Sequence, residues 1–200
     1  MLKKIAEQFR KPAGLGGKIV SGLMEKGNRI ACDKLLEKHY SVTNGRILEI
    51  GYGPGYGIQM VYSSNPERQI EGIDFSELMF KKCSLRHKKL ITAGKLKLYH
   101  GDFLSFDFGE KKYDQIFCIN VIYFWEELEK PFRKIFDLLN KEGTFCFYFS
   151  HKNDLNKLKF TKEEIFNKYD IEIVKEKLKL AGFDEVESIF DHGYFIKGIK

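Results

Sequence analysis

The stretch from Arg46 to Gly55, Arg-Ile-Leu-Glu-Ile-Gly-Tyr-Gly-Pro-Gly, constrains the fold of this chain more than any other. Residues of strand character, with an acid near their end, run into glycines at positions 51, 53 and 55, and an apolar segment with helical spacing follows. Glycine lets a backbone adopt positive φ or lie directly against a ligand, because it has no Cβ atom. The stretch therefore predicts a strand, a tight turn and a helix wrapped around a small molecule.

The spacing of these glycines discriminates between classes of ligand. The dinucleotide fingerprint G-x-G-x-x-G requires its third glycine at position 56, which is Tyr56 here. The carboxylate of Glu49, two residues before Gly51, would repel a pyrophosphate and favours a positively charged ligand. A cationic nucleoside without phosphates fits better than a dinucleotide. The segment from Leu48 to Gly55 resembles the cofactor loop of class I S-adenosylmethionine-dependent methyltransferases.

Two later strand ends also carry acids. Residues 69–74 are predicted as a strand that ends in Asp74, where a carboxylate can accept hydrogen bonds from both hydroxyls of a ribose. Asp74 could instead cap the following helix, although Ser76 is also placed to do so. Residues 95–101 are a third strand, after which the resemblance places Asp102 at the adenine amino group and Phe103 beside the ring. A simple turn-forming role is the alternative for Asp102.

Residues 113–125 form a near-continuous apolar run, which predicts a central strand covered on both faces and its exit loop. In the resembled family this loop lies beside the sulfonium and the acceptor, so Asn120, Tyr123 and Trp125 are expected to shape the reaction site. Plain burial is the alternative for Phe124 and Trp125. The loop lacks the Pro-Pro-Tyr or Pro-Pro-Phe that follows Asn or Asp in enzymes methylating bases or glutamine. This favours the ubiquinone/menaquinone C-methyltransferase-like group, which acts on small molecules.

The resemblance implies S-adenosylmethionine as the cofactor and S-adenosylhomocysteine as its product. The cofactor contacts that it implies are Glu49, Gly51, Tyr52, Gly53, Gly55, Asp74, Phe75, Ser76, Met79, Gly101, Asp102, Phe103, Asn120, Val121 and Ile122. Tyr123 is the candidate catalytic residue, and His39 and His151 are further candidate bases. None is obligatory if the acceptor is already nucleophilic, since the protein then has only to align acceptor and methyl group and exclude water.

The remaining patterns predict helices and strands in alternation. Helices are expected over residues 3–9, about 19–39, 58–62, 76–91, 126–139 and 171–180, and further strands over 144–150, 185–190 and 194–199. Together they predict an α/β fold with a doubly wound, Rossmann-like, seven-stranded sheet. The resemblance implies the strand order 3-2-1-4-5-7-6 with the last strand antiparallel. We expect a single domain over residues 1–200, with an N-terminal helical extension or lid over 1–45 and the core over 46–200.

That extension has two possible roles. Residues 10–15 and 24–29 resemble the openings of small-molecule members of the family, in which such an extension covers the cofactor mouth and forms part of the substrate pocket. An ordinary packing helix is the alternative. No helix-length apolar run approaches the roughly 20 residues of a membrane span, and the N-terminus is too charged for a signal peptide, so we expect a cytoplasmic protein.

Composition limits the partners and the metal chemistry. The net charge of +6 would suit nucleic acid, anionic lipid or an acidic substrate, but the chain has no RNA-reading motif. The 4 cysteines and 5 histidines lack metal-ligand spacing, so we predict reduced cysteines and no metal site.

We therefore expect an enzyme, a methyltransferase that transfers a methyl group by in-line displacement to a small, planar or acidic acceptor. An RNA methyltransferase and a cofactor-binding protein without transferase activity remain as alternatives. We expect a monomer or homodimer and do not expect nucleic acid as a partner.

Overall fold

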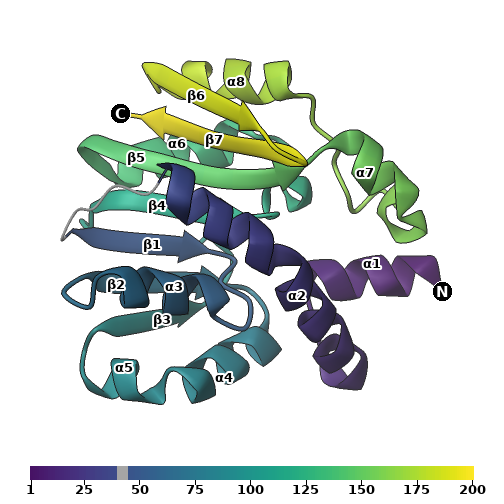
Figure 1. Ribbon diagram of the computed structural model, residues 1–200, viewed down its shortest axis with the longest axis horizontal. Helices are drawn as coiled ribbons and strands as arrows, with labels where there is room; N and C mark the ends of the chain where they lie inside the picture. The colour runs from purple at the N-terminus through teal and green to yellow at the C-terminus, as the bar shows by residue number, and fades with distance from the viewer. Residues whose placement is uncertain (40–44) are drawn as a thin grey trace.

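A seven-stranded sheet forms the centre of the molecule in the computed structural model, which describes residues 1–39 and 45–200 without the side chain of His39 (Figure 1). The strand order is β3-β2-β1-β4-β5-β7-β6. Neighbours from β3 to β5 are parallel, whereas β7 runs antiparallel to both β5 and β6. The predicted fold class, strand order and antiparallel last strand are confirmed. Residues 40–44, at the end of the predicted extension, lie outside the described residues.

The strands follow the apolar runs of the sequence closely. They are β1 (Arg46–Ile50), β2 (Gln69–Asp74), β3 (Leu96–His100), β4 (Tyr113–Ile119), β5 (Leu139–Ser150), β6 (Glu185–Phe190) and β7 (Gly193–Ile199). The central strands β1 and β4 are buried along nearly their whole length, because helices cover both faces of the sheet.

The helices fall into two layers. They are α1 (Leu2–Arg10), α2 (Gly14–His39), α3 (Tyr56–Ser64), α4 (Glu77–Arg86), α5 (Lys88–Thr92), α6 (Glu129–Leu138), α7 (Lys152–Lys157) and α8 (Ile171–Leu180), with 3-10 turns η1 (Ile122–Phe124) and η2 (Lys159–Lys162). One core layer joins the sheet to α2, α3 and α4, and the other joins it to α6 and α8. Among the described residues, no helix is long and apolar enough to cross a membrane.

The N-terminal helices place two extra walls beside the sheet. Helix α2 crosses the sheet diagonally, and α1 lies beyond the carboxyl ends of the parallel strands (Figure 1). The Phe9 ring of α1 stacks on the Phe160 ring of η2, with 4.3 Å between their centroids. The segment after β5, for which we predicted no element, therefore contains short helical turns that support α1.

Several predicted element boundaries differ from the structure. The helix expected from about residue 19 begins at Gly14. The helix expected over 76–91 divides at His87, whose φ of −108° and ψ of 23° separate α4 from α5. The helix expected from 126 begins at Glu129. The strand expected from 144 begins at Leu139, because residues 141–143 form an irregularity within β5, where Glu142 has φ of 61° and the pairing with β4 shifts register.

Candidate functional site

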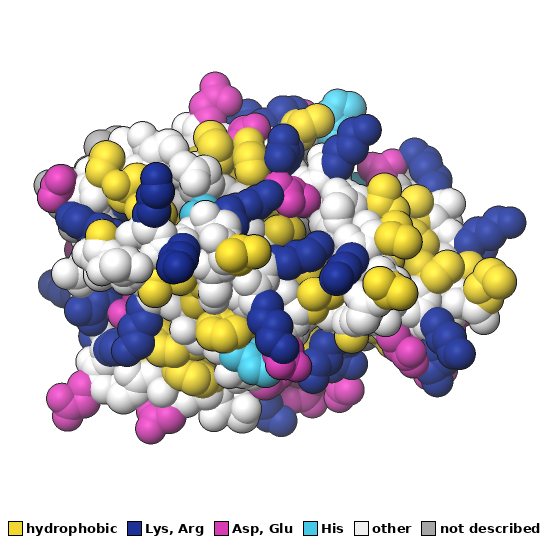
Figure 2. Space-filling model, turned by 90° about the horizontal axis from the view of Figure 1, so that it is seen from below, with side chains coloured by type: hydrophobic (Ala, Val, Ile, Leu, Met, Phe, Trp, Pro, Cys, Tyr) yellow, Lys and Arg dark blue, Asp and Glu magenta, His cyan; other side chains and the backbone are white. Residues whose placement is uncertain are grey.

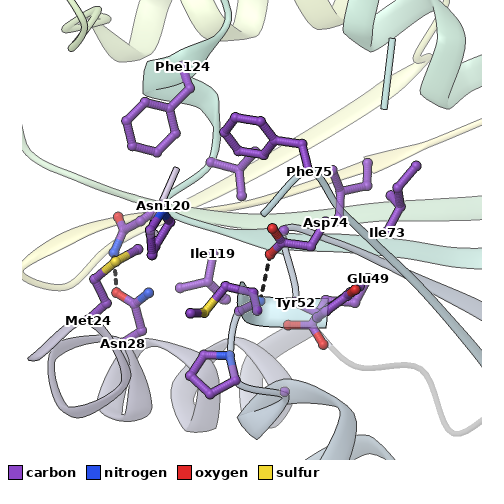
Figure 3. Close-up of a pocket in the computed structure, with 18 of the residues that line it drawn as sticks. Met24, Asn28, Glu49, Tyr52, Ile73, Asp74, Phe75, Ile119, Asn120 and Phe124 are labelled. Carbon is purple, nitrogen blue, oxygen red and sulfur yellow. Dashed lines mark hydrogen bonds between the residues drawn. The ribbon is translucent and has the colours of Figure 1, made fainter. Parts of the chain in front are cut away.

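A cleft of about 1130 Å³, including its open mouth, lies at the carboxyl ends of β1, β2 and β4 and is walled by α1 and α2. The structure brings 12 of the 15 predicted contact residues to its lining: Glu49, Gly51, Tyr52, Gly53, Asp74, Phe75, Met79, Gly101, Asp102, Phe103, Asn120 and Val121. The other three, Gly55, Ser76 and Ile122, do not line the cleft. Each of them directly follows a lining residue in the sequence. Figure 3 shows side chains from the strand ends and from α2 converging on one space.

The glycine turn has positive φ at each of its three glycines, 72° at Gly51, 52° at Gly53 and 89° at Gly55. A Cβ atom at Gly51 would lie 2.6 Å from Val121 Cγ2, and one at Gly55 would lie 2.6 Å from Cys83 Sγ. A Cβ atom at Gly53 would meet no protein atom within 4 Å. Packing within the protein therefore requires glycine at 51 and 55, whereas Gly53 borders the open space of the cleft.

A carboxylate lies buried beneath this turn. The side chain of Glu49 is 4% exposed, and its Oε2 atom has no hydrogen-bond partner among the described residues. Burial and then the charge of Asp74 raise the pKa of Glu49 well above its usual range, and the Ile58 N–H opposes them. A Cβ atom at Gly57 would lie 2.4 Å from Glu49 Oε1, so this glycine, which sequence reasoning missed, lets the carboxylate lie against the start of α3. Glycine recurs at every second position from 51 to 57, and this spacing could have identified Gly57 from the sequence.

Asp74 holds the turn from the neighbouring strand. Its Oδ2 accepts a hydrogen bond from the Gly53 N–H at 2.9 Å and its Oδ1 accepts one from the Ser76 N–H at 2.9 Å. Burial raises the pKa of Asp74 to about 6, and these two N–H groups limit the rise. The cap of α4 is Ser76, whose hydroxyl accepts from the Met79 N–H at 3.3 Å and donates to the Pro12 carbonyl at 2.6 Å. The capping role considered for Asp74 thus belongs to Ser76.

The loop after β3 forms another wall. Asp102 Oδ1 accepts hydrogen bonds from the backbone N–H groups of Leu104 at 2.8 Å and Ser105 at 3.2 Å, so this carboxylate shapes a turn while also lining the cleft. The Lys134 ammonium group on α6 donates to the Leu104 carbonyl at 2.9 Å and lies 5.3 Å from the centre of the Phe103 ring. Lys134 was not predicted as a site residue, and its contacts hold this loop in place from α6.

The residue after β4 links the sheet to α2. Asn120 has φ of 56°, and its Nδ2 donates to Asn28 Oδ1 at 2.8 Å (Figure 3). Its Oδ1 accepts from the Tyr123 hydroxyl at 2.8 Å, and that hydroxyl also accepts a close hydrogen bond from the Ser150 N–H. The Tyr123 side chain is 3% exposed and is not among the lining residues, and burial raises its pKa. The hydroxyl predicted as a catalytic group is therefore engaged in orienting Asn120.

The candidate base His151 is not in the lining either. His151 caps α7, and its Nδ1 accepts from the Asn153 N–H at 3.2 Å. The side chain of His39 lies outside the described part of the structure. Of the three predicted bases, Tyr123 and His151 do not line the cleft, and the prediction for His39 falls outside the described side chains.

The N-terminal helices contribute a wall of the cleft. The sequence predicted this wall only as the segments 10–15 and 24–29 and did not identify its individual residues. Its residues are Phe9, Arg10, Pro12, Ser21, Met24, Glu25, Asn28 and Cys32. The members on α2 recur every three or four positions, which places them on one helix face. That spacing was the signal that would have identified them.

Ion pairs attach α2 to the glycine turn. The Glu25 carboxylate accepts from Arg86 Nη2 at 2.9 Å and from Arg29 Nη2 at 3.0 Å, and Arg86 Nη1 donates to the Pro54 carbonyl at 3.0 Å. The Tyr56 hydroxyl donates to Asp33 at 2.9 Å. Because α2 is held at both the glycine turn and Asn120, its position and the shape of the cleft are coupled.

The donor and acceptor set of the cleft favours a particular kind of ligand. Four acids line it, namely Glu25, Glu49, Asp74 and Asp102, whereas Arg10 is the only cationic side chain among the described lining residues. This balance disfavours a pyrophosphate and favours a ligand with positive charge and hydroxyl donors. Phe75 and Phe124 add aromatic faces on the opposite side from Met24 (Figure 3). The residues present thus fit a cationic nucleoside.

Comparison with known proteins adds an independent finding. Residues 47–143 match the protein family described as a methyltransferase domain. An uncharacterised methyltransferase of Bacillus subtilis, YdaC, is 30% identical over 103 residues, which cover 51% of this chain and 55% of that protein. A malonyl-[acyl-carrier protein] O-methyltransferase of Legionella pneumophila is 26% identical over 144 residues, covering 72% of this chain and 49% of that protein. The chain spans about half the length of these curated relatives.

Solved structures share the fold. Phosphoethanolamine N-methyltransferase 2 of Haemonchus contortus, in complex with phosphomonomethylethanolamine and S-adenosylhomocysteine, superposes with a TM-score of 0.78 at 15% identity. The superposition covers 100% of this chain and 60% of that one.

Proposed function

We propose that this chain, whose residues 47–143 match the protein family described as a methyltransferase domain, binds S-adenosylmethionine in the cleft and transfers its methyl group to a small-molecule acceptor. The observation that carries the proposal is the arrangement around Gly53. Open space lies where a Cβ atom would be, with the Asp74 carboxylate bonded to the turn and the unsatisfied Glu49 carboxylate beneath it. A positively charged ligand in that space would relieve the raised pKa of both acids.

Each predicted contact has a proposed task. Asp74 is to accept the ribose hydroxyl hydrogens, and Asp102 is to accept from the adenine amino group with Phe103 beside the ring. Gly51 and Gly53 let the backbone approach the ligand closely. The remaining predicted contacts, Glu49, Tyr52, Gly55, Phe75, Ser76, Met79, Gly101, Asn120, Val121 and Ile122, line the cleft or support its walls.

The cofactor supplies the reactive methyl group on a sulfonium, and its transfer to a nucleophile leaves S-adenosylhomocysteine. The task of the chain is to hold the acceptor in line and to exclude water. Among the described lining residues there is no lysine or histidine, which supports an acceptor that is already nucleophilic. We propose Tyr123 as a positioning residue, which acts through the hydrogen bond from its hydroxyl to Asn120.

The acceptor side of the cleft supports a small, apolar and planar acceptor, as in the ubiquinone/menaquinone C-methyltransferase-like group. Phe9, Phe124 and Trp125 provide flat apolar walls there, and Arg10 supplies positive charge for an acidic substituent. The alternatives are an RNA methyltransferase and a binding protein that retains the cofactor without turnover. The engaged hydroxyl of Tyr123 keeps the second of these open.

Calorimetric titration with S-adenosylmethionine, S-adenosylhomocysteine and NADH tests the cofactor assignment. We expect micromolar binding of the first two ligands and no binding of NADH. Binding of NADH alone would overturn the assignment. Methyl transfer with formation of S-adenosylhomocysteine, in a screen of quinol, phenol and acidic acceptors, would support the transferase, whereas cofactor binding without turnover on any acceptor would favour the binding protein. Strong, salt-dependent affinity for RNA would favour the RNA methyltransferase.

A further inference from the structure

An exposed apolar stripe runs along the first half of α2. Leu15, Ile19, Leu23 and Ile30 expose 80%, 70%, 60% and 67% of their surface, respectively. At 100° per residue these side chains fall within an arc of about 80°, and they span about 22 Å along the helix axis. Large hydrophobic side chains at this level of exposure, gathered on one side of one helix, indicate a surface that is covered in use.

The stripe lies in a segment of the chain with a large excess of positive charge. Residues 1–30 contain 7 of the basic residues, Lys3, Lys4, Arg10, Lys11, Lys18, Lys26 and Arg29, against only 2 acids, Glu7 and Glu25. The Glu25 carboxylate is already paired with Arg29 and Arg86. The segment therefore carries a net charge of +5 out of the +6 of the whole chain. Figure 2 shows hydrophobic side chains interspersed with lysine and arginine at the end of the molecule that carries α1.

We propose that the stripe and its basic surroundings dock on an anionic lipid surface, with the first half of α2 lying in the plane of the interface. A helix whose exposed aliphatic side chains are interspersed with lysines matches helices that lie at a membrane interface, where apolar side chains enter the headgroup boundary and cations pair with anionic lipids. Charge complementarity argues against a second copy, because two such faces would bring like charges together. The stripe is aliphatic, whereas single-stranded nucleic acid is bound by stacking on aromatic rings.

The docking face is continuous with the cleft. Leu23 of the stripe directly precedes Met24, which lines the cleft. Arg10 on α1 and Asn28 on α2 also line it. A lipid surface against the stripe would therefore lie beside the cleft mouth. If the proposed function holds, the chain would reach an amphiphilic acceptor at that surface. The docking itself does not rest on the proposed function.

Co-sedimentation with vesicles tests the proposal. Vesicles of phosphatidylcholine alone are compared with vesicles containing about one third phosphatidylglycerol. We expect at least tenfold stronger binding to the anionic vesicles, weakened by salt. The variant Ile19→Ser/Leu23→Ser and the variant Lys18→Glu/Lys26→Glu should each lower the anionic-vesicle affinity at least tenfold.

The control changes two exposed apolar residues on α8, Ile173 at 44% and Leu180 at 53%. The variant Ile173→Ser/Leu180→Ser should bind anionic vesicles like the unmodified chain. Absence of vesicle binding, or equal loss in the control, would overturn the proposal. A dimer that dissociates in the Ile19→Ser/Leu23→Ser variant would assign the face to a second copy instead and would also overturn it. Titration with S-adenosylhomocysteine should be unchanged in all of these variants, so failure of docking is distinguishable from failure of the proposed function.

Discussion

At the scale of single residues, the cleft places carboxylates where burial disfavours their charge. Asp74 is 7% exposed and is bonded to two backbone N–H groups, yet its pKa rises to about 6 from an ordinary value of 3.8. Between pH 3.8 and about 6 the folded state keeps a proton on Asp74 that the unfolded state has released, so the free energy of unfolding falls as the pH rises through this range. Above pH 6 the ionised Asp74 therefore destabilises the ligand-free protein. The destabilisation is relieved as the pH falls through 6. A site that costs stability when empty is suited to a ligand that restores it.

This linkage predicts a pH-dependent difference between the unmodified chain and Asp74→Asn. On lowering the pH from about 7.5 to 5, the unmodified ligand-free chain should gain roughly 1–1.5 kcal/mol in free energy of unfolding relative to the variant. Urea unfolding at several pH values measures this difference. A difference that stays constant over this range would mean that Asp74 titrates like an exposed acid.

Several site residues could be predicted from sequence because their chemistry is local. Gly51, Gly53 and Asp74 were predicted because the glycine spacing and the strand-end acid are visible in the chain itself. Lys134 could not be predicted, since it acts on the loop after β3 from α6, about thirty residues away. Tyr123 was predicted as a catalytic candidate from its place after β4, but its bonds to Asn120 and Ser150 arise only in the folded chain.

At the scale of elements, α2 combines weak helix propensity with many tertiary attachments. It contains Gly14, Gly16, Gly17, Gly22 and Gly27, and glycine within a helix costs up to about 1 kcal/mol relative to alanine. A Cβ atom at Gly22 or Gly27 would meet no atom within 4 Å. Contacts to the glycine turn and to Asn120, rather than intrinsic propensity, therefore hold this helix in place.

We predict that Gly22→Ala and Gly27→Ala each raise the free energy of unfolding by about 0.5–1 kcal/mol, because each removes conformational freedom from the unfolded chain without a clash. Thermal unfolding monitored by circular dichroism measures the effect. Gly17→Ala is the contrasting variant, since its Cβ atom would lie 2.7 Å from the Pro12 carbonyl carbon, and it should destabilise the chain. Destabilisation by both Gly22→Ala and Gly27→Ala would contradict this description of α2.

Element boundaries were predictable where the apolar pattern is local and not where tertiary contacts decide. The bounds of β2, β6 and α8 match the prediction, because turn residues flank clear periodic runs. The break at His87 was not foreseen, since its ring turns inward to the Gly55 carbonyl at 2.8 Å from Nε2. That contact joins the α4–α5 junction to the glycine turn. The apolar pattern of the helix contains no sign of such a long-range contact.

At the scale of the whole molecule, the sheet and the N-terminal helices each form part of the cleft wall. The carboxyl ends of the strands carry the acids and the glycine turn, as the doubly wound arrangement requires. The wall on the other side comes from α1 and α2, whose sequence was predicted only as a helical extension. Strand order followed from the family resemblance and is confirmed, whereas the single-domain assignment stays a prediction.

We assign the space at Gly53 to the cofactor, and two matched glycines test this assignment. Gly53 and Gly94 both have positive φ, 52° and 69°, and a Cβ atom at either meets no protein atom within 4 Å, but only Gly53 lines the cleft. Alanine should therefore cost similar backbone strain at both positions. Calorimetric titration with S-adenosylhomocysteine should show at least tenfold weaker binding for Gly53→Ala and unchanged binding for Gly94→Ala. Equal affinity in Gly53→Ala and the unmodified chain would contradict the assignment of this space to the cofactor.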